Sequence, residues 1–110
     1  MISKDLVAAS AKPLILSILL EGKSYGYEII QQVRELSNGQ MQWKEGMLYP
    51  VLHRLEKQGL IDSEWQTSDS GRKRKYYYIK EEGHKALKAE KKQWMAVHLT
   101  LTKLWEGSDV

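Results

Sequence analysis

Gly71-Arg72-Lys73-Arg74-Lys75-Tyr76-Tyr77-Tyr78 is the stretch of sequence that decides the fold. Four cations in succession lead into three aromatic residues, and a helical pattern ends shortly before them, at Gly59. Residues 60–66 and 73–79 alternate with a period of two, which is typical of paired strands. The residues between them, Thr-Ser-Asp-Ser-Gly at 67–71, favour a turn. A basic hairpin that follows a short helix is the wing with which winged helix-turn-helix proteins hold a phosphate backbone, so DNA binding is the leading hypothesis.

Three helical patterns come before this wing. Residues 3–21 predict a first helix with Ser3 as its N-cap and Gly22 just past its end. The second half of this stretch is apolar almost all round, which predicts a central core helix. Pro13 lies inside it and removes one backbone donor, so we expect a kink or a helix that restarts near Pro13.

The next two helices are expected at about 25–37, capped by Ser24, and at about 45–58. Joined by a short connection, they fit a helix-turn-helix arrangement in which the second member is the recognition helix. Apolar residues at helical spacing predict its buried face. The opposite face carries groups suited to phosphate oxygens and base edges: Gly46, Tyr49, Pro50, His53, Arg54 and Lys57, with Lys44 just before the helix.

The candidate DNA-binding residues come from this helix and from the wing, and their roles are not equally specific. Tyr49 is expected either to contact phosphate or to pack under the wing, and His53 is more simply a surface residue. Strand alternation places Arg72 and Arg74 on one face and the two wing lysines on the other, so only some of the four cations touch DNA at once. The full set is Lys44, Gly46, Tyr49, His53, Arg54, Arg72, Lys73, Arg74 and Lys75.

A last helix is expected from Glu81 to about 105. It carries a heptad-like apolar stripe, whose members are Leu87, Trp94, Val97, Leu101, Leu104 and Trp105. This amphipathic helix is surplus to the winged core, and a second subunit is the simplest surface on which to bury it. We therefore predict an α+β, mainly α, fold: a winged helix-turn-helix domain over 1–80, with the wing at about 60–80, and a C-terminal dimerisation helix over 81–110.

The charge of the chain is unevenly distributed. The net charge over 110 residues is +3, yet residues 72–92 hold nine Lys or Arg and three Asp or Glu, which is +6, so the rest sums to −3. Such asymmetry is typical of a protein that binds a polyanion. A solvated, highly charged helix is the alternative explanation.

Other classes of protein find little support in the sequence. There is no cysteine, so no disulfide or thiolate metal site is expected, and the histidines at 53, 84 and 98 are too far apart to converge on a metal. No Ser-His-Asp spacing or Gly-rich phosphate loop indicates an enzyme, and no cofactor is expected. No apolar run of about 18 residues and no signal-peptide pattern occurs, which predicts a cytoplasmic protein without a membrane span.

Four segments together resemble the PadR family of bacterial transcriptional regulators. They are Tyr25-Gly26-Tyr27-Glu28-Ile29-Ile30, the run from Leu48-Tyr49-Pro50 to Gly59-Leu60-Ile61, the wing motif quoted above, and Glu82-Gly83-His84. The resemblance covers about residues 14–105. It implies a winged-helix repressor that dimerises through its C-terminal helix, in the short branch of the family. Lys44 and Met47 depart from the family pattern, in which a small polar residue and Ser or Thr are usual.

Residues 37–41 and Trp94 are similar to the small multidrug-binding members of that family. The resemblance implies that Trp94 of each subunit flanks a flat pore at the dimer interface, where a planar aromatic ligand stacks. Val97 and His98 would line this pore, with Leu101 and Leu104 nearby. Taken from the residues alone, a Trp in a heptad stripe is more often interface packing.

The leading hypothesis is therefore a homodimeric DNA-binding transcriptional regulator, a repressor released by a small aromatic ligand. Two recognition helices related by a two-fold axis would bind a double-stranded operator that contains an inverted repeat. The alternative is a winged-helix module for protein–protein interaction without sequence-specific DNA binding. Phosphate binding predicts an affinity that falls steeply with salt, whereas a protein interface predicts a weaker dependence.

Overall fold

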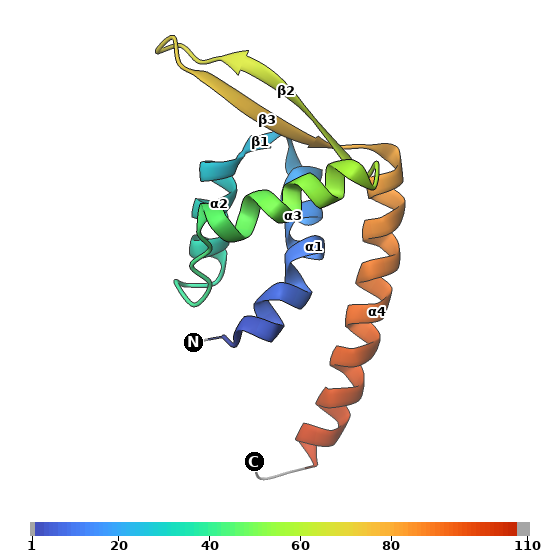
Figure 1. Ribbon diagram of the computed structural model, residues 1–110. Helices are drawn as coiled ribbons and strands as arrows, with labels where there is room; N and C mark the ends of the chain where they lie inside the picture. The colour runs from blue at the N-terminus through green and yellow to red at the C-terminus, as the bar shows by residue number, and fades with distance from the viewer. Residues whose placement is uncertain (1, 108–110) are drawn as a thin grey trace.

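A computed structural model of the chain describes residues 2–107 and contains four helices and a small sheet. Residues 108–110 of the predicted C-terminal region lie outside the described residues. Helices α1–α3 gather beneath the sheet, and α4 descends alongside α1 and continues beyond it (Figure 1). The molecule is therefore elongated, with extents of 56 × 29 × 21 Å. The elements are α1 (Lys4–Glu21), β1 (Ser24–Tyr25), α2 (Gly26–Leu36), α3 (Glu45–Lys57), β2 (Ile61–Thr67), β3 (Lys73–Ile79) and α4 (Glu81–Glu106).

The sheet has three antiparallel strands in the order β1-β3-β2. The β2–β3 hairpin confirms the predicted wing, with Ile61 opposite Ile79 at its base and Thr67 opposite Lys73 near its tip. Strand β1 was not predicted, and the assignment of Ser24 as a helix cap was wrong. Ser24 pairs with Tyr77 in the sheet, and its hydroxyl donates to the Glu28 carboxylate (2.6 Å). A two-residue strand is too short to leave a periodic signal.

Helix α1 begins as the sequence predicts and bends without breaking. The Ser3 side chain accepts a hydrogen bond from the Leu6 amide (3.3 Å), so its role as N-cap is confirmed. The helix continues through Pro13, and its ribbon changes direction in the N-terminal half (Figure 1). A proline inside a helix removes one backbone bond and crowds the preceding turn, which accounts for a bend. The alternative of a helix that restarts is wrong.

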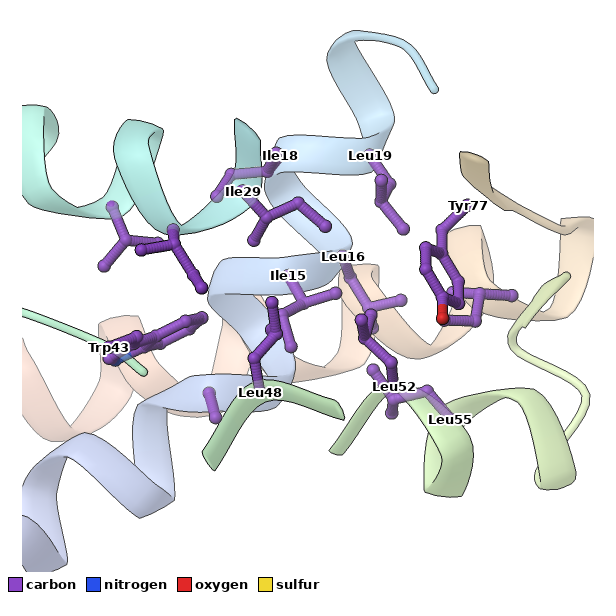
Figure 2. Close-up of a cluster of buried hydrophobic side chains, with 14 of the residues drawn as sticks. Ile15, Leu16, Ile18, Leu19, Ile29, Trp43, Leu48, Leu52, Leu55 and Tyr77 are labelled. Carbon is purple, nitrogen blue, oxygen red and sulfur yellow. The ribbon is translucent and has the colours of Figure 1, made fainter. Parts of the chain in front are cut away.

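The hydrophobic core lies where the first three helices meet the sheet (Figure 2). The connection between α2 and α3 also reaches into this core, because Trp43 is 4% and Met41 8% exposed. This anchor holds the start of α3 in place and was missed by the sequence analysis, because the connection shows no period. The other buried side chains come mainly from helix stripes and include Ile15, Leu16, Leu19, Ile29, Val33, Leu48, Leu52, Leu55, Ile61 and Tyr77.

The first turns of α4 are part of the same core. The Lys80 amide donates to the Leu60 carbonyl (3.0 Å), and Gly83 follows so close to that carbonyl that a Cβ would overlap it. Leu87 is 3% exposed and packs in the core of its own chain. Its assignment to the dimer interface is therefore wrong: the stripe begins inside the monomer because α4 leaves the sheet directly against α1.

Candidate nucleic-acid interface

Helix α3 separates an apolar face from an exposed polar one, as the recognition-helix assignment requires. Leu48, Leu52 and Leu55 are buried. The residues of the opposite face that the sequence analysis selected are exposed except Tyr49, which is half-buried: Lys44, Gly46, Pro50, His53, Arg54 and Lys57. Lys44 precedes the helix without a capping hydrogen bond from its side chain.

The exposed residues of α3 do not all face the wing. Gly46, Pro50 and Arg54 line a groove of about 340 Å³ against α1, which contributes Lys12. Tyr49 lines a different cleft on the wing side of the helix. The structure therefore divides the candidate DNA-binding residues of α3 between the two flanks of the helix.

The wing sorts its cations by face. Lys75 approaches α3, with its Nζ atom 3.9 Å from Glu56 Oε1. Arg74 points to the other side, where its guanidinium carbon lies 4.4 Å from the centre of the Tyr25 ring. This confirms the predicted opposition of neighbouring cations in the strand. Arg72 and Lys73, at the exposed tip, make no ion pair within residues 2–107.

A cleft that is both basic and aromatic lies between the wing and the start of α2 and α3. Its volume is about 460 Å³. Two of its aromatic residues were missed by the sequence analysis: Trp65, which is 68% exposed, and Tyr27, which is 59% exposed. Trp65 lies opposite Lys75 in the hairpin, so strand pairing was the signal that could have found it. The lining comprises Tyr25, Gly26, Tyr27, Glu45, Tyr49, Trp65, Arg72, Lys73, Arg74 and Lys75.

Tyr49 serves as a packing residue at the edge of this cleft. Gly26 accommodates its phenol so closely that a Cβ at Gly26 would meet the ring and its hydroxyl oxygen. The glycine at the start of α2 therefore lets α3 approach. Tyr49 also lines the cleft, so packing under the wing and contact with phosphate are compatible roles, and the second stays a prediction.

The tyrosines of the wing are structural. Burial, followed by the nearby Glu56 carboxylate and Tyr49, raises the pKa of Tyr77 to about 12. The Asp62 carboxylate is the main cause that raises the pKa of Tyr78. Tyr76 packs edge-on against Tyr25, with ring centres 5.4 Å apart. Tyr77 is thus a neutral core residue, and Tyr76 packs against β1 through Tyr25.

The candidate dimerisation and ligand residues lie on the later part of α4. Trp94 is 36% exposed, and its indole N–H donates to Glu90 Oε2 (3.1 Å). Its ring lines an apolar cavity of about 420 Å³ with residues of α1, including Leu6 and Leu14, and with Met41. Val97 and His98 do not line that cavity. Val97, Leu101, Leu104 and Trp105 are all exposed.

Other kinds of site are not apparent in the part of the chain that the structure describes. Within residues 2–107, no three His, Asp or Glu side chains converge as a metal site would require. No helix of that part combines the length and apolarity needed to cross a membrane.

A helix-turn-helix pair, a cationic hairpin at its side and a long terminal helix define a winged-helix DNA-binding protein. The family model described as the transcriptional regulator PadR-like family matches residues 15–89. The chain belongs to this family, whose members are DNA-binding transcriptional regulators that generally bind DNA as dimers.

Individual relatives match almost the whole chain. An uncharacterized protein of Lysinibacillus sphaericus is 36% identical over 107 residues, which are 97% of this chain and 98% of that protein. The structure of a transcriptional regulator from Clostridium thermocellum has 36% identity and a TM-score of 0.84, and the match covers 94% of this chain and 97% of the other. A PadR-like transcriptional regulator from Bacillus cereus has 30% identity and a TM-score of 0.85, with coverages of 96% and 100%.

Proposed function

We propose that the protein is a homodimeric repressor that binds an inverted-repeat operator and is released by a small planar aromatic ligand. The observation that carries this proposal is the separation of two surfaces. The cationic wing lies at the top of the molecule with α3 beneath the sheet, and the distal half of α4 lies at the bottom (Figure 1). This distal half, Lys91–Glu106, carries an exposed apolar stripe.

The apolar stripe supports the dimer. Leu104 is 66%, Trp105 58% and Val97 56% exposed in the single chain. Large apolar side chains clustered on one helix mark an interaction surface. The most common soluble oligomer is a two-fold dimer in which the same patch of both subunits meets. Such an axis would place two α3 helices at successive turns of one face of the duplex, about 34 Å apart.

The wing supports binding to the phosphate backbone. Arg72 and Lys73 at its tip are exposed, and the exposed residues of α3 add Arg54 and Lys57, of which Arg54 lies on the flank of the helix that faces α1. Each phosphate that a cation neutralises releases counterions, so affinity should fall by about 0.9 log unit per log unit of salt for each such contact. The alternative of a protein-binding wing predicts a shallower dependence.

The cavity beside Trp94 supports an aromatic effector. It is wide open to solvent, with a volume of about 420 Å³, so a flat ring could lie on it while a second subunit covers the other side. The indole offers a stacking face for a planar ring, which attracts cationic rings as well as neutral ones. The dimer can adopt a conformation that binds DNA and another whose wings are spaced differently. A ligand releases DNA only if it binds the second conformation more tightly than the first.

The decisive experiment combines assembly, DNA binding and release. The DNA upstream of the chain's own coding region is searched for an inverted repeat, and a duplex that contains it is labelled. Anisotropy is followed for this duplex and for a scrambled one at several salt concentrations, with light scattering on the same samples. We expect a dimer, a preference for the inverted repeat, a steep salt dependence, and loss of binding on addition of a planar cationic dye. A strict monomer at micromolar concentration, or equal and weak affinity for both duplexes, would contradict the proposal.

A further inference from the structure

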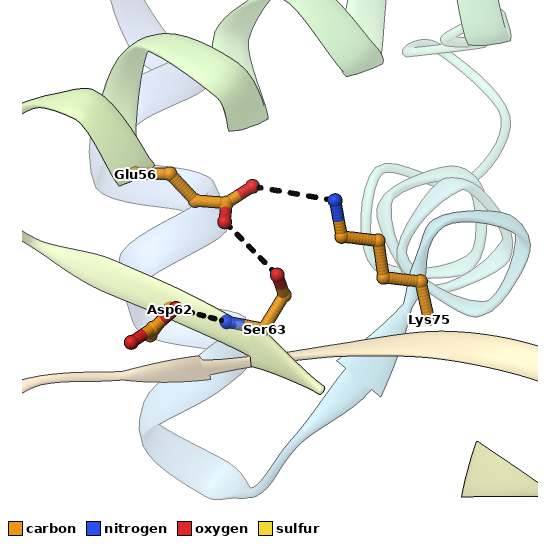
Figure 3. Close-up of polar contacts among 4 residues, drawn as sticks. All are labelled: Glu56, Asp62, Ser63 and Lys75. Atoms are coloured by element: carbon orange, nitrogen blue, oxygen red, sulfur yellow. Dashed lines mark hydrogen bonds and ion pairs between the residues drawn. The ribbon is translucent and has the colours of Figure 1, made fainter. Parts of the chain in front are cut away.

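One carboxylate joins the recognition helix to both strands of the wing (Figure 3). Glu56 lies in the last turns of α3. Its Oε2 atom accepts a hydrogen bond from the Ser63 hydroxyl of β2 (2.9 Å), and its Oε1 atom lies 3.9 Å from Lys75 Nζ of β3. The same side chain therefore fixes the position of the hairpin relative to α3.

The surroundings of Glu56 make the loss of the Lys75 cation unfavourable. The Oε1 atom is shut off from solvent and accepts no hydrogen bond from any residue between 2 and 107. A separation of 3.9 Å exceeds the roughly 2.7–2.9 Å of a charge-assisted hydrogen bond, so Lys75 stabilises this oxygen through charge alone. Removing the cation leaves this solvent-shielded oxygen without a compensating charge, which is unfavourable.

Lys75 is held at a second point as well. Its ammonium lies 5.5 Å from the centre of the ring of Tyr77, which is 1% exposed. The Lys75 side chain is 31% and the Glu56 side chain 23% exposed. Lys75 therefore differs from Lys73, two residues earlier on the same face of the strand, which is exposed and has no such partner within the described residues.

We propose that Glu56 is a positioning residue that reserves Lys75 for the joint between α3 and the wing and so keeps this lysine off the DNA phosphates. The proposal rests on DNA binding by the wing. It assigns phosphate contact to the tip, Arg72 and Lys73, and it fixes the angle between wing and recognition helix. Without the charge of Glu56, Lys75 becomes an additional phosphate ligand that carries no sequence information, and discrimination between operator and other duplexes declines.

The chain offers a matched control for the charge of Glu56. Glu64 of β2 pairs with Lys23 (3.7 Å), and both of these side chains are about half exposed, at 49% and 48%. Because Glu64 lies opposite Tyr76 in the hairpin, it faces away from α3. Glu64→Gln and Glu56→Gln change the net charge of the wing region equally, but only the second releases Lys75.

The test is a salt titration of binding to the inverted repeat and to a scrambled duplex. We expect Glu56→Gln, whose amide still accepts from Ser63, to steepen the slope by about 0.9 for each subunit, so that affinity falls about 3.5-fold further per subunit between 50 and 200 mM salt. Glu64→Gln should steepen it by clearly less. The ratio of affinities for the two duplexes should fall in Glu56→Gln only.

A second pair of variants decides the matter if Glu56→Gln does not fold by circular dichroism. Lys73→Ala should lower the salt slope by about 0.9 per subunit, and Lys75→Ala should lower it by much less. Where Glu56→Gln does fold, adding Lys75→Ala to it should remove the added slope. Equal slopes for Glu56→Gln and Glu64→Gln, or equal losses for the two lysine variants, would overturn the inference. Absence of DNA binding by the unaltered protein would instead defeat the proposed function.

Discussion

The two halves of α4 share one heptad-like stripe but lie in different surroundings. The proximal half, Glu81–Glu90, buries Gly83 and Leu87 in the core of the chain. The distal half, Lys91–Glu106, is fully described and buries none of its residues. Glu90 marks the boundary, because it pairs with Lys12 of α1 (3.7 Å) and accepts the Trp94 N–H. The proximal half therefore stabilises the fold of a single chain, whereas the distal half remains available for contact with a second chain.

The largest expected loss of stability follows from substitution of Gly83, in the proximal half. A Cβ there would overlap the Leu60 carbonyl oxygen and press on Ile79. Alanine gains about 1 kcal/mol of helix propensity over glycine, but displacing a backbone carbonyl outweighs this gain. We expect Gly83→Ala to lower the free energy of unfolding by about 4 kcal/mol, as measured by denaturant unfolding.

The control for this substitution is Gly46→Ala, on the exposed side of α3. A Cβ at Gly46 meets no atom within 4 Å, so this variant should be about 0.5–1 kcal/mol more stable. If Gly83→Ala and Gly46→Ala had similar stability, the close attachment of the proximal half would be refuted.

The second prediction compares the loss of stability caused by replacing one leucine in each half of α4. Leu87→Ala removes a side chain that is 3% exposed and should cost about 3 kcal/mol, at every protein concentration, because it leaves a cavity in the core. Leu104→Ala alters a side chain that is 66% exposed. In dilute protein it should cost less than about 0.5 kcal/mol, and its cost should rise with concentration as subunits associate.

Thermal melts at two protein concentrations make this comparison. A cost of Leu104→Ala that does not depend on concentration would mean that the distal half does not join a second chain.

The third effect concerns assembly itself. Charges at Leu101 and Leu104, on the exposed stripe, should prevent two distal halves from packing. We expect the double substitution Leu101→Glu, Leu104→Glu to raise the dimer dissociation constant at least about 100-fold, which corresponds to about 2.7 kcal/mol. Sedimentation velocity measures this change, and an unaltered far-ultraviolet spectrum shows that the chain still folds. A double variant that remains dimeric would place the interface elsewhere.

Periodicity predicted most of the fold because each helix stripe and each strand alternation follows from burial on one side. Ser3, the two faces of the wing and the apolar face of α3 were all read correctly from the sequence. Periodicity could not divide α4, since Leu87, Trp94 and Leu101 repeat at one interval although only Leu87 is buried. An apolar stripe predicts that one face of a helix is buried. Only the tertiary structure shows whether that face packs against the same chain or against a second one.

The remaining misses have a common physical origin. Trp43 and β1 lie in segments too short for a period, and Glu56 reaches partners seven and nineteen residues away that only the hairpin register brings together. Of the four wing cations, sequence could show that they alternate. It could not show that Lys75 and Arg74 already have partners in the fold.

The smallest expected effect tests the residue just beyond the boundary between the halves. Trp94 lines the apolar cavity against α1, whereas Trp105 is 58% exposed near the end of the helix. If an aromatic ligand stacks on Trp94, Trp94→Ala should weaken binding of a planar cationic dye at least about tenfold, which is about 1.4 kcal/mol. Trp105→Ala should weaken it less. Binding is measured by titration, with the fluorescence of the dye as the signal, so that the loss of a tryptophan does not affect the readout. Both variants are first shown to be dimers. Equal affinities for the two variants would leave Trp94 as a packing residue that Glu90 holds against α1.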